Sequence, residues 1–137
     1  MRSHVVAMVA VLAAMIEPCR ALDLPPQEII RENCVKAQAI VEGSIQSFEI
    51  PHNWPATRTE FRVDRVYRGP LRAGEMIIYY SSREAGTIKV GDDLLLFLIR
   101  WTDPAGVKKW GTATEFSELP TSPQLEAKVR ECARRKR

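Results

Sequence analysis

The chain has 137 residues, of which 45% are hydrophobic and 27% are charged, and its formal net charge at pH 7 is +3. This length provides one hydrophobic core and not two, so we expect no second folded domain. The small charge gives no general support for binding nucleic acid or an anionic membrane. The excess positive charge lies in the tail Arg134–Arg137. We expect this tail to be solvated, with attraction to anionic lipid or polysaccharide as the alternative.

The first 21 residues have the pattern of a secretory signal peptide. Arg2 gives a basic start, the run Val5–Ile16 is apolar throughout, and Cys19 and Ala21 place small residues three and one positions before a cleavage point. A helix needs about 20 apolar residues to span a bilayer, and this run is shorter. We therefore expect a cleaved signal and no transmembrane anchor.

Attachment of a lipid at Cys19 is the alternative, but Glu17 and Pro18 stand where a lipobox has small or apolar residues. We expect a protein that is secreted or periplasmic, with a signal peptide at 1–21 and one mature domain at 22–137. Removal of the signal takes away two arginines and one glutamate, which lowers the net charge to +2.

The mature chain begins with a short predicted helix followed by a long predicted strand. Two prolines precede Gln27–Glu32, which suits a helix with proline in its first turn. From Val35 to Gln46 the apolar residues recur with a period of two, which predicts a strand. Gly43 within it indicates a β-bulge or a sharp bend, of the sort that a small barrel needs at a corner.

Further strands are predicted where β-branched and aromatic residues gather between turn residues. These segments are Thr57–Arg68, Glu75–Ser81, Thr87–Val90 and Val107–Glu115.

The segment Leu94–Ile99 is apolar on both faces and too short for a typical helix, so we expect it to be the most buried strand. Another element must then cover its outer side. A C-terminal helix is the best candidate, since Ser122 can cap it and Pro123 suits its first position. Its apolar stripe consists of Leu125, Val129, Cys132 and Ala133.

Five or six short strands, with a glycine inside one of them and a short helix at each end, predict a mainly β protein. A closed or partly open small barrel fits this pattern, because closure removes the exposed edges of a sheet.

Cys34 and Cys132 are the two cysteines that remain after cleavage. An even number of cysteines in an oxidising compartment indicates a disulfide first. This bridge would tie the start of the domain to its last helix, and the chain-entropy model gives such a long loop about 4–5 kcal/mol of stabilisation. The alternative is two separate thiols, with Cys132 packed as a small apolar residue.

Four features carry a resemblance to a known family when they are taken in this order. They are Cys34, the strand Ala39–Ile45, the strand Phe61–Arg68 with its Gly69 turn, and the segment Val90–Leu98. This order resembles the oligonucleotide/oligosaccharide-binding (OB) barrel of the tissue inhibitors of metalloproteinases and of netrin-like modules, including exported bacterial relatives. The resemblance covers about Cys34–Glu118. It implies a five- to six-stranded OB-like barrel with a short N-terminal helix and a C-terminal helix.

One departure from this family bears on function. The animal inhibitors chelate the zinc of a protease through a cysteine at the mature N-terminus, within a Cys-x-Cys opening. Here the mature chain would begin Leu22-Asp23-Leu24. Inhibition of a metalloprotease would have to proceed without that chelator.

The mature chain has few residues for catalysis. His52 would be its one histidine, and no nucleophile elbow accompanies it, so we expect no enzyme and interpret His52 as a surface loop residue. A zinc site from His52, Cys34 and Cys132 lacks the usual paired spacing of ligands. A turn accounts for Asp92 and Asp93 better than a cation site does. We expect no metal and no cofactor.

Aromatic residues are the best candidates for contact with a partner, because several fall on strands and loops that could line the binding face of a barrel. Tyr79 and its neighbour Tyr80 must point to opposite faces of a strand, so one surface can include only one of them. Packing in the core and at the rim is the alternative role. The selected candidates are Trp54, Tyr79, Trp101 and Trp110.

We therefore expect an exported, non-catalytic OB-fold module that binds an extracytoplasmic protein through its loops and one open face. A protease is one candidate partner, and the protein would then act as an inhibitor. A carbohydrate-binding envelope protein is the other alternative, in which the tryptophans would contact a polysaccharide. Export argues against nucleic acid as a partner.

Overall fold

The computed structural model describes residues 26–51, 56–82 and 88–135. The expected signal peptide, His52 and Trp54 lie outside these ranges. The described elements are, in order, α2 (Gln27–Lys36), β1 (Ala39–Glu49), β2 (Thr57–Arg68), β3 (Met76–Ser81), β4 (Asp93–Thr102), β5 (Lys108–Thr112), β6 (Glu118–Pro120) and α3 (Pro123–Arg134).

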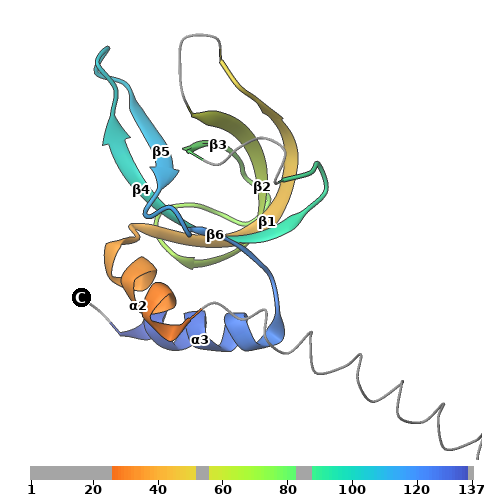
Figure 1. Ribbon diagram of the computed structural model, residues 1–137, viewed down its shortest axis with the longest axis vertical. Helices are drawn as coiled ribbons and strands as arrows, with labels where there is room; N and C mark the ends of the chain where they lie inside the picture. The colour runs from red at the N-terminus through yellow and green to blue at the C-terminus, as the bar shows by residue number, and fades with distance from the viewer. Residues whose placement is uncertain (1–25, 52–55, 83–87, 136–137) are drawn as a thin grey trace, which may run out of the picture.

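Five of these strands close into a barrel (Figure 1). Strand β1 pairs with β2, β2 with β3, β3 with β5, β5 with β4, and β4 with β1 again. The β3–β5 pairing is parallel and the others are antiparallel. The extra strand, β6, pairs with the first half of β4. The protein is therefore mainly β, with a small OB-like barrel and a helix before and after it in sequence.

Strand β1 is curved, and it pairs with β2 along one edge and with β4 along the other (Figure 1). Its register with β2 shifts between Glu42 and Gly43, which confirms the bulge predicted there. A Cβ at position 43 would collide with the carbonyl oxygen of Arg62 and would lie 2.8 Å from Cε1 of Phe61. Only glycine lets the two strands approach this closely.

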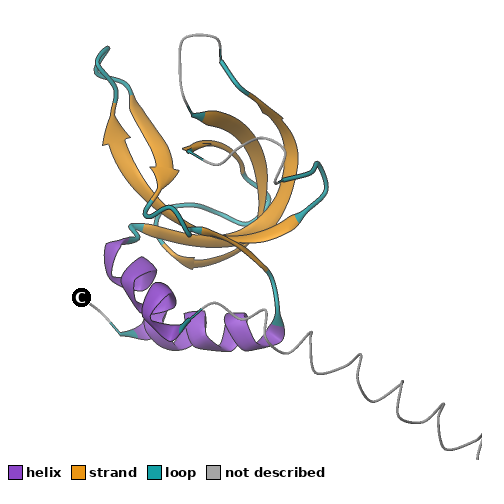
Figure 2. Cartoon of the chain, in the orientation of Figure 1, coloured by secondary structure: helices purple, strands orange, loops and turns teal. Residues whose placement is uncertain are grey.

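The buried hydrophobic residues form two clusters, one on each face of strand β4. Leu94, Leu96 and Leu98 point into the barrel, whereas Leu95 and Phe97 pack against the helices. Figure 2 shows α2 and α3 together on one side of the barrel. The prediction that β4 is buried on both faces is confirmed, and both helices contribute to its cover.

The N-terminal helix is longer than the sequence pattern predicts. It continues to Lys36, so Val35 is the ninth residue of α2 and is 66% exposed, where we expected it on the apolar face of a strand. Buried Ile30 and Cys34 lie four residues apart on one face of the helix, and Lys36 forms an ion pair with Glu32 one turn earlier. These helical contacts override the local alternation of apolar residues.

The predicted strand at Thr87–Val90 is not observed over residues 88–90, which lead into a turn. The N–H of Lys89 donates to Oδ2 of Asp92, and Gly91 has a φ of +92°. Asp92 thus acts as a turn residue, as we predicted. The strand expected at Val107–Glu115 is shorter than its predicted span, and the short strand β6 that follows it was not predicted.

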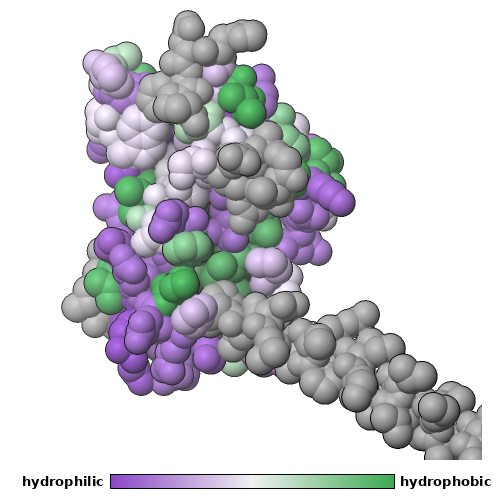
Figure 3. Space-filling model, viewed as in Figure 1, coloured by the Kyte–Doolittle hydropathy of each residue, from purple (hydrophilic) through white to green (hydrophobic). Residues whose placement is uncertain are grey.

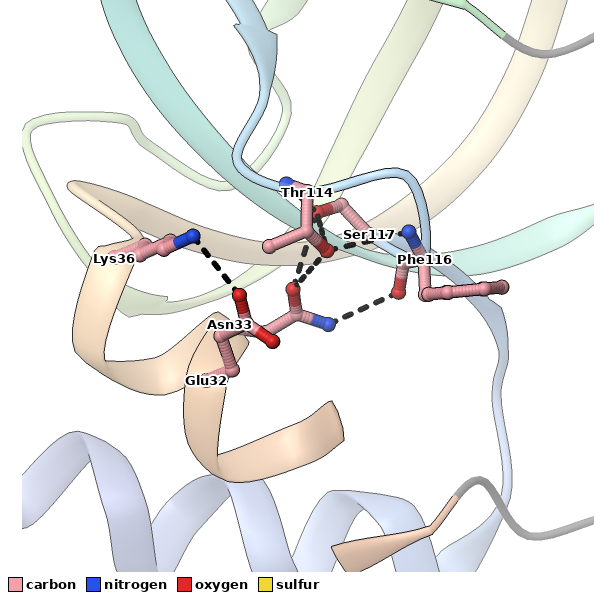
Figure 4. A network of polar contacts seen from close by, with 6 residues as sticks. All are labelled: Glu32, Asn33, Lys36, Thr114, Phe116 and Ser117. Atoms are coloured by element: carbon pink, nitrogen blue, oxygen red, sulfur yellow. Dashed lines mark hydrogen bonds and ion pairs between the residues drawn. The ribbon is translucent and has the colours of Figure 1, made fainter. Parts of the chain in front are cut away.

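Asn33 on α2 is fully buried and holds the connection between β5 and β6 (Figure 4). Its Nδ2 donates to the carbonyl oxygen of Phe116 over 2.9 Å. Its Oδ1 accepts hydrogen bonds from the hydroxyl groups of Thr114 and Ser117. This side chain therefore joins the first helix to a loop more than 80 residues away in sequence.

A disulfide and one arginine join both helices to the barrel. Cys34 and Cys132 are bonded, with Cα atoms 6.1 Å apart. Beside them Arg68, the last residue of β2, donates to the carbonyl oxygens of Cys34, Ala37 and Cys132 over 2.5, 3.1 and 3.2 Å. These carbonyls lie at the C-terminal ends of the two helices, where backbone groups lack intrahelical partners. One guanidinium therefore caps both helices.

The substitution Arg68→Met tests this role, because it keeps much of the side-chain volume and removes the charged donors. We expect it to lower the free energy of unfolding by about 2–3 kcal/mol, since three carbonyls lose a charged partner. Urea denaturation of the oxidised protein measures the change. Arg62→Met, on the same strand but exposed to solvent, is the control and should change stability by less than about 0.5 kcal/mol. Equal effects of the two substitutions would contradict the capping role of Arg68.

Candidate functional site

Strand β3 presents an apolar row to the outside of the barrel. Its side chains alternate, so that Ile77 and Tyr79 are buried inside while Met76, Ile78 and Tyr80 face outward. Met76 is 52% exposed and Ile78 is 39% exposed. Large apolar side chains that lie side by side on a strand and remain in contact with solvent are typical of binding surfaces.

The row continues across β5 to β4 because position 111 is a glycine. Gly111 is the parallel partner of Tyr80, and a Cβ there would lie 2.8 Å from Nε1 of Trp101. The space left by the glycine is taken by the indole. The rings of Tyr80 and Trp101 meet edge to face, with centroids 6.1 Å apart and planes at 81°.

A lysine and an aspartate fix the polar end of this row. Lys109 places its ammonium 5.1 Å from the centre of the Tyr80 ring and 3.0 Å from Oδ2 of Asp103. The other carboxylate oxygen, Oδ1, accepts hydrogen bonds from the N–H groups of Ala105 and Val107. The bond to Lys109 lowers the pKa of Asp103, and the same bond raises the pKa of Lys109. Both groups therefore stay charged near neutral pH, and the turn between β4 and β5 is held in place.

We call this surface the outer aromatic face. It consists of Met76, Ile78, Tyr80, Trp101 and Lys109.

Tyr79 and Trp110, two of the residues selected from the sequence, pack inside the barrel. Tyr79 is fully buried, and its hydroxyl donates to Oε2 of Glu118 over 2.7 Å. Trp110 is 6% exposed, and the guanidinium of Arg100 lies 4.4 Å from the centre of its ring. The alternative role in core and rim packing therefore applies to both, and neither provides a surface for a partner.

Trp101 is the selected candidate that the structure places on an outward surface, and Trp54 lies outside the described residues. The structure places Tyr80, and not Tyr79, beside it. Met76 and Ile78 were not selected, although the period of two in residues 76–81 places them on the same face as Tyr80. Which face is outward depends on the pairing with β2 and β5, and the pattern of β3 alone does not reveal it.

Apolar side chains also gather where the barrel meets the helices on the view in Figure 3, whereas hydrophilic side chains cover most of the helical layer there.

Among the described residues, no group of three or more His, Cys, Asp or Glu side chains is arranged to hold a metal ion. The disulfide also removes both thiolates from the zinc site considered above. In the described part of the chain, no helix has the length and hydropathy to span a membrane.

Comparison of the chain with models of protein families and with curated proteins finds no match. The resemblance to the inhibitors of metalloproteinases and the netrin-like modules therefore remains a prediction.

A pair of carboxyl groups lies between the barrel and α3. Burial raises the pKa of Glu42 on β1 to about 7, and the carboxyl of Glu126 on α3 adds to the rise through a hydrogen bond and its charge. Asp64 raises this pKa as well, whereas Arg65 lowers it. Arg65 also lies 4.0 Å from Oε2 of Glu126. A proton on Glu42 removes the repulsion between its carboxyl group and the neighbouring carboxyl groups.

This pair predicts a pH dependence of stability. The native state of Glu42 binds its proton more tightly than the unfolded state, so stability should fall as pH rises from about 4.5 to about 7. Glu42→Gln cannot ionise and should be more stable than the unmodified protein at pH 8 by about 1 kcal/mol, since solvent screens these partly exposed groups. The difference should vanish near pH 4. Urea denaturation at both pH values measures it, with Glu115→Gln on an exposed loop as the control. An equal gain at pH 4 and pH 8 would contradict the account.

Proposed function

We propose that this protein is an exported, non-catalytic binding module that captures a protein partner on the outer aromatic face. The observation that carries this proposal is the exposed row of Met76, Ile78 and Tyr80, which continues to Trp101. Tyr and Trp are enriched at the centres of protein interfaces, and a methionine adapts its shape to a partner.

The position of this face in the fold supports the proposal. Barrels of the OB type commonly bind their ligands on the face of the second and third strands and on the loops between strands one and two and between strands four and five. Here β3 carries the apolar row, and the turn 103–107 between β4 and β5 lies at its end. A fold-level analogy of this kind indicates a location, and the side chains indicate the chemistry.

Charged residues on β2 form a polar rim beside the apolar row. Arg58 pairs with Tyr80 in register and lies 3.4 Å from Glu49 and 3.6 Å from Glu60. Along the same strand, Nε of Arg62 lies 3.2 Å from Oδ1 of Asp64. An apolar centre with a charged rim is the usual anatomy of a protein–protein interface. A partner with its own mixed charges around an apolar anchor fits this surface best.

The disulfide supports the proposed location outside the cytoplasm, because such bonds persist in oxidising compartments. A protease remains a candidate partner, and inhibition would then require a loop or the outer aromatic face to block the protease. A carbohydrate-binding role is the second candidate, since Trp101 and Tyr80 offer adjacent aromatic surfaces.

Photocrosslinking in the native export host tests the proposed function. A photoreactive phenylalanine analogue at Met76 should give one defined adduct with another protein, and the same analogue at the exposed turn residue Arg72 should give none. Trp101→Ala should abolish the adduct and lower the affinity for the captured partner by roughly 10- to 100-fold. The captured protein is identified by mass spectrometry and its affinity is measured with purified components.

Two other results would contradict the proposal. Equal adducts from Met76 and Arg72 would show that contact at this face is not specific. A change in tryptophan fluorescence on addition of soluble polysaccharide, lost in Trp101→Ala and without any protein adduct, would favour the carbohydrate-binding role.

Slowing of an extracellular metalloprotease by stoichiometric amounts of this protein would agree with the proposal and would identify the partner class as a protease.

A further inference from the structure

A groove of about 660 Å³ runs between α2 and α3 and is separate from the outer aromatic face. One face of α2 contributes Ile30, Arg31, Cys34 and Val35, and α3 contributes Lys128 and Cys132. Gln27 also lines the groove, and from Gln27 to Val35 helix α2 extends about 12 Å at 1.5 Å per residue. Cavities of this volume are typical of small-molecule sites.

The floor and one edge of the groove are apolar. Ile30 and Cys34 are buried at its base, and the disulfide to Cys132 joins the two helices across it. Val35 lies at the edge and is 66% exposed. A ligand with an apolar chain would cover Val35 and remove its side chain from water.

The rim of the groove is positively charged. Arg31 from α2 and Lys128 from α3 line it from opposite helices. Within the described ranges neither of these two side chains is paired with a carboxylate. Glu131 also lines the groove, but Arg135 neutralises it over 2.8 Å. Two cations therefore remain available for an anionic group.

We propose that this groove binds a small amphiphile with a single acyl or alkyl chain and an anionic headgroup. The chain would lie along Ile30, Val35 and the disulfide, and Arg31 and Lys128 would hold the carboxylate or phosphate. A helix of a partner protein fits less well, because a stable interface needs about 800 Å² from each partner and this groove spans barely two helical turns.

The test is calorimetric titration of the oxidised protein, below the micelle-forming concentration of each probe. Decanoate and decyl phosphate are the two anionic probes and distinguish a fatty acid from a phospholipid-like ligand. Decyl maltoside lacks the charge, and acetate and inorganic phosphate lack the chain. We expect saturable 1:1 binding of at least one anionic probe, at least ~10-fold tighter than that of decyl maltoside.

Variants locate the binding. Arg31→Gln with Lys128→Gln should weaken binding by ~10-fold or more, and Val35→Glu should weaken it as well, because it places an anion at the apolar edge. The matched control is Arg130→Gln with Arg134→Gln. It also removes two positive charges, but both residues are on α3 and line a different depression, beside Val66 and Tyr67. This control should bind as the unmodified protein does.

Four results would overturn the proposal. They are the absence of saturable binding, equal affinity for decyl maltoside, equal losses in the two double variants, and tighter binding of an acidic amphipathic peptide than of either anionic probe. Trp101→Ala should leave binding of the amphiphile unchanged, so failure of this proposal is distinguishable from failure of the proposed function.

Discussion

The contact on which the rest of the fold depends is the junction of Arg68 with the disulfide between Cys34 and Cys132. It brings together the end of β2, the end of α2 and the end of α3, which are remote from one another in sequence. Each helix would otherwise end with carbonyl groups that have no partner. The guanidinium satisfies them with charge-assisted hydrogen bonds, and the covalent bond keeps the two helices together.

This junction has consequences for the barrel. Because α2 and α3 are held beneath β4, Leu95 and Phe97 can be apolar on the outer side of that strand without being exposed. Strand β4 can then pair with β1, β5 and β6 and close the barrel. The helices cover one side of the barrel, and they do not cover the outward sides of β3 and β5. This division explains why the apolar row of β3 is exposed while equally apolar residues on β4 are not.

Much of this fold could be predicted from sequence because local pattern and tertiary pairing agree. Strand β2 has the predicted bounds Thr57–Arg68, Gly43 lies at a bulge, and Ser122 caps α3 through the N–H of Leu125. The end of α2 was not predicted. Two long-range hydrogen bonds hold its last turn. Arg68 donates to the carbonyl oxygen of Ala37, and Asn33 donates to that of Phe116. No local pattern encodes these bonds.

The candidate site was predictable only in part. Trp101, selected as a candidate for contact with a partner, lies on the outward side of the barrel. Tyr79 was preferred to Tyr80 because alternation alone does not reveal which face is inward. That choice is made by the register with Thr59 on β2 and Trp110 on β5. The groove with the positively charged rim arises where two helices meet, and a sequence pattern within either helix describes only half of it.

The most direct test of this account is the intact mass of the protein purified from its native host, after unfolding and alkylation, with and without prior reduction. Peptide mapping then locates the alkylated thiols. The account predicts no alkylation of Cys34 or Cys132 before reduction and alkylation of both afterwards. A free thiol at either position before reduction would contradict the junction that holds the helices to the barrel.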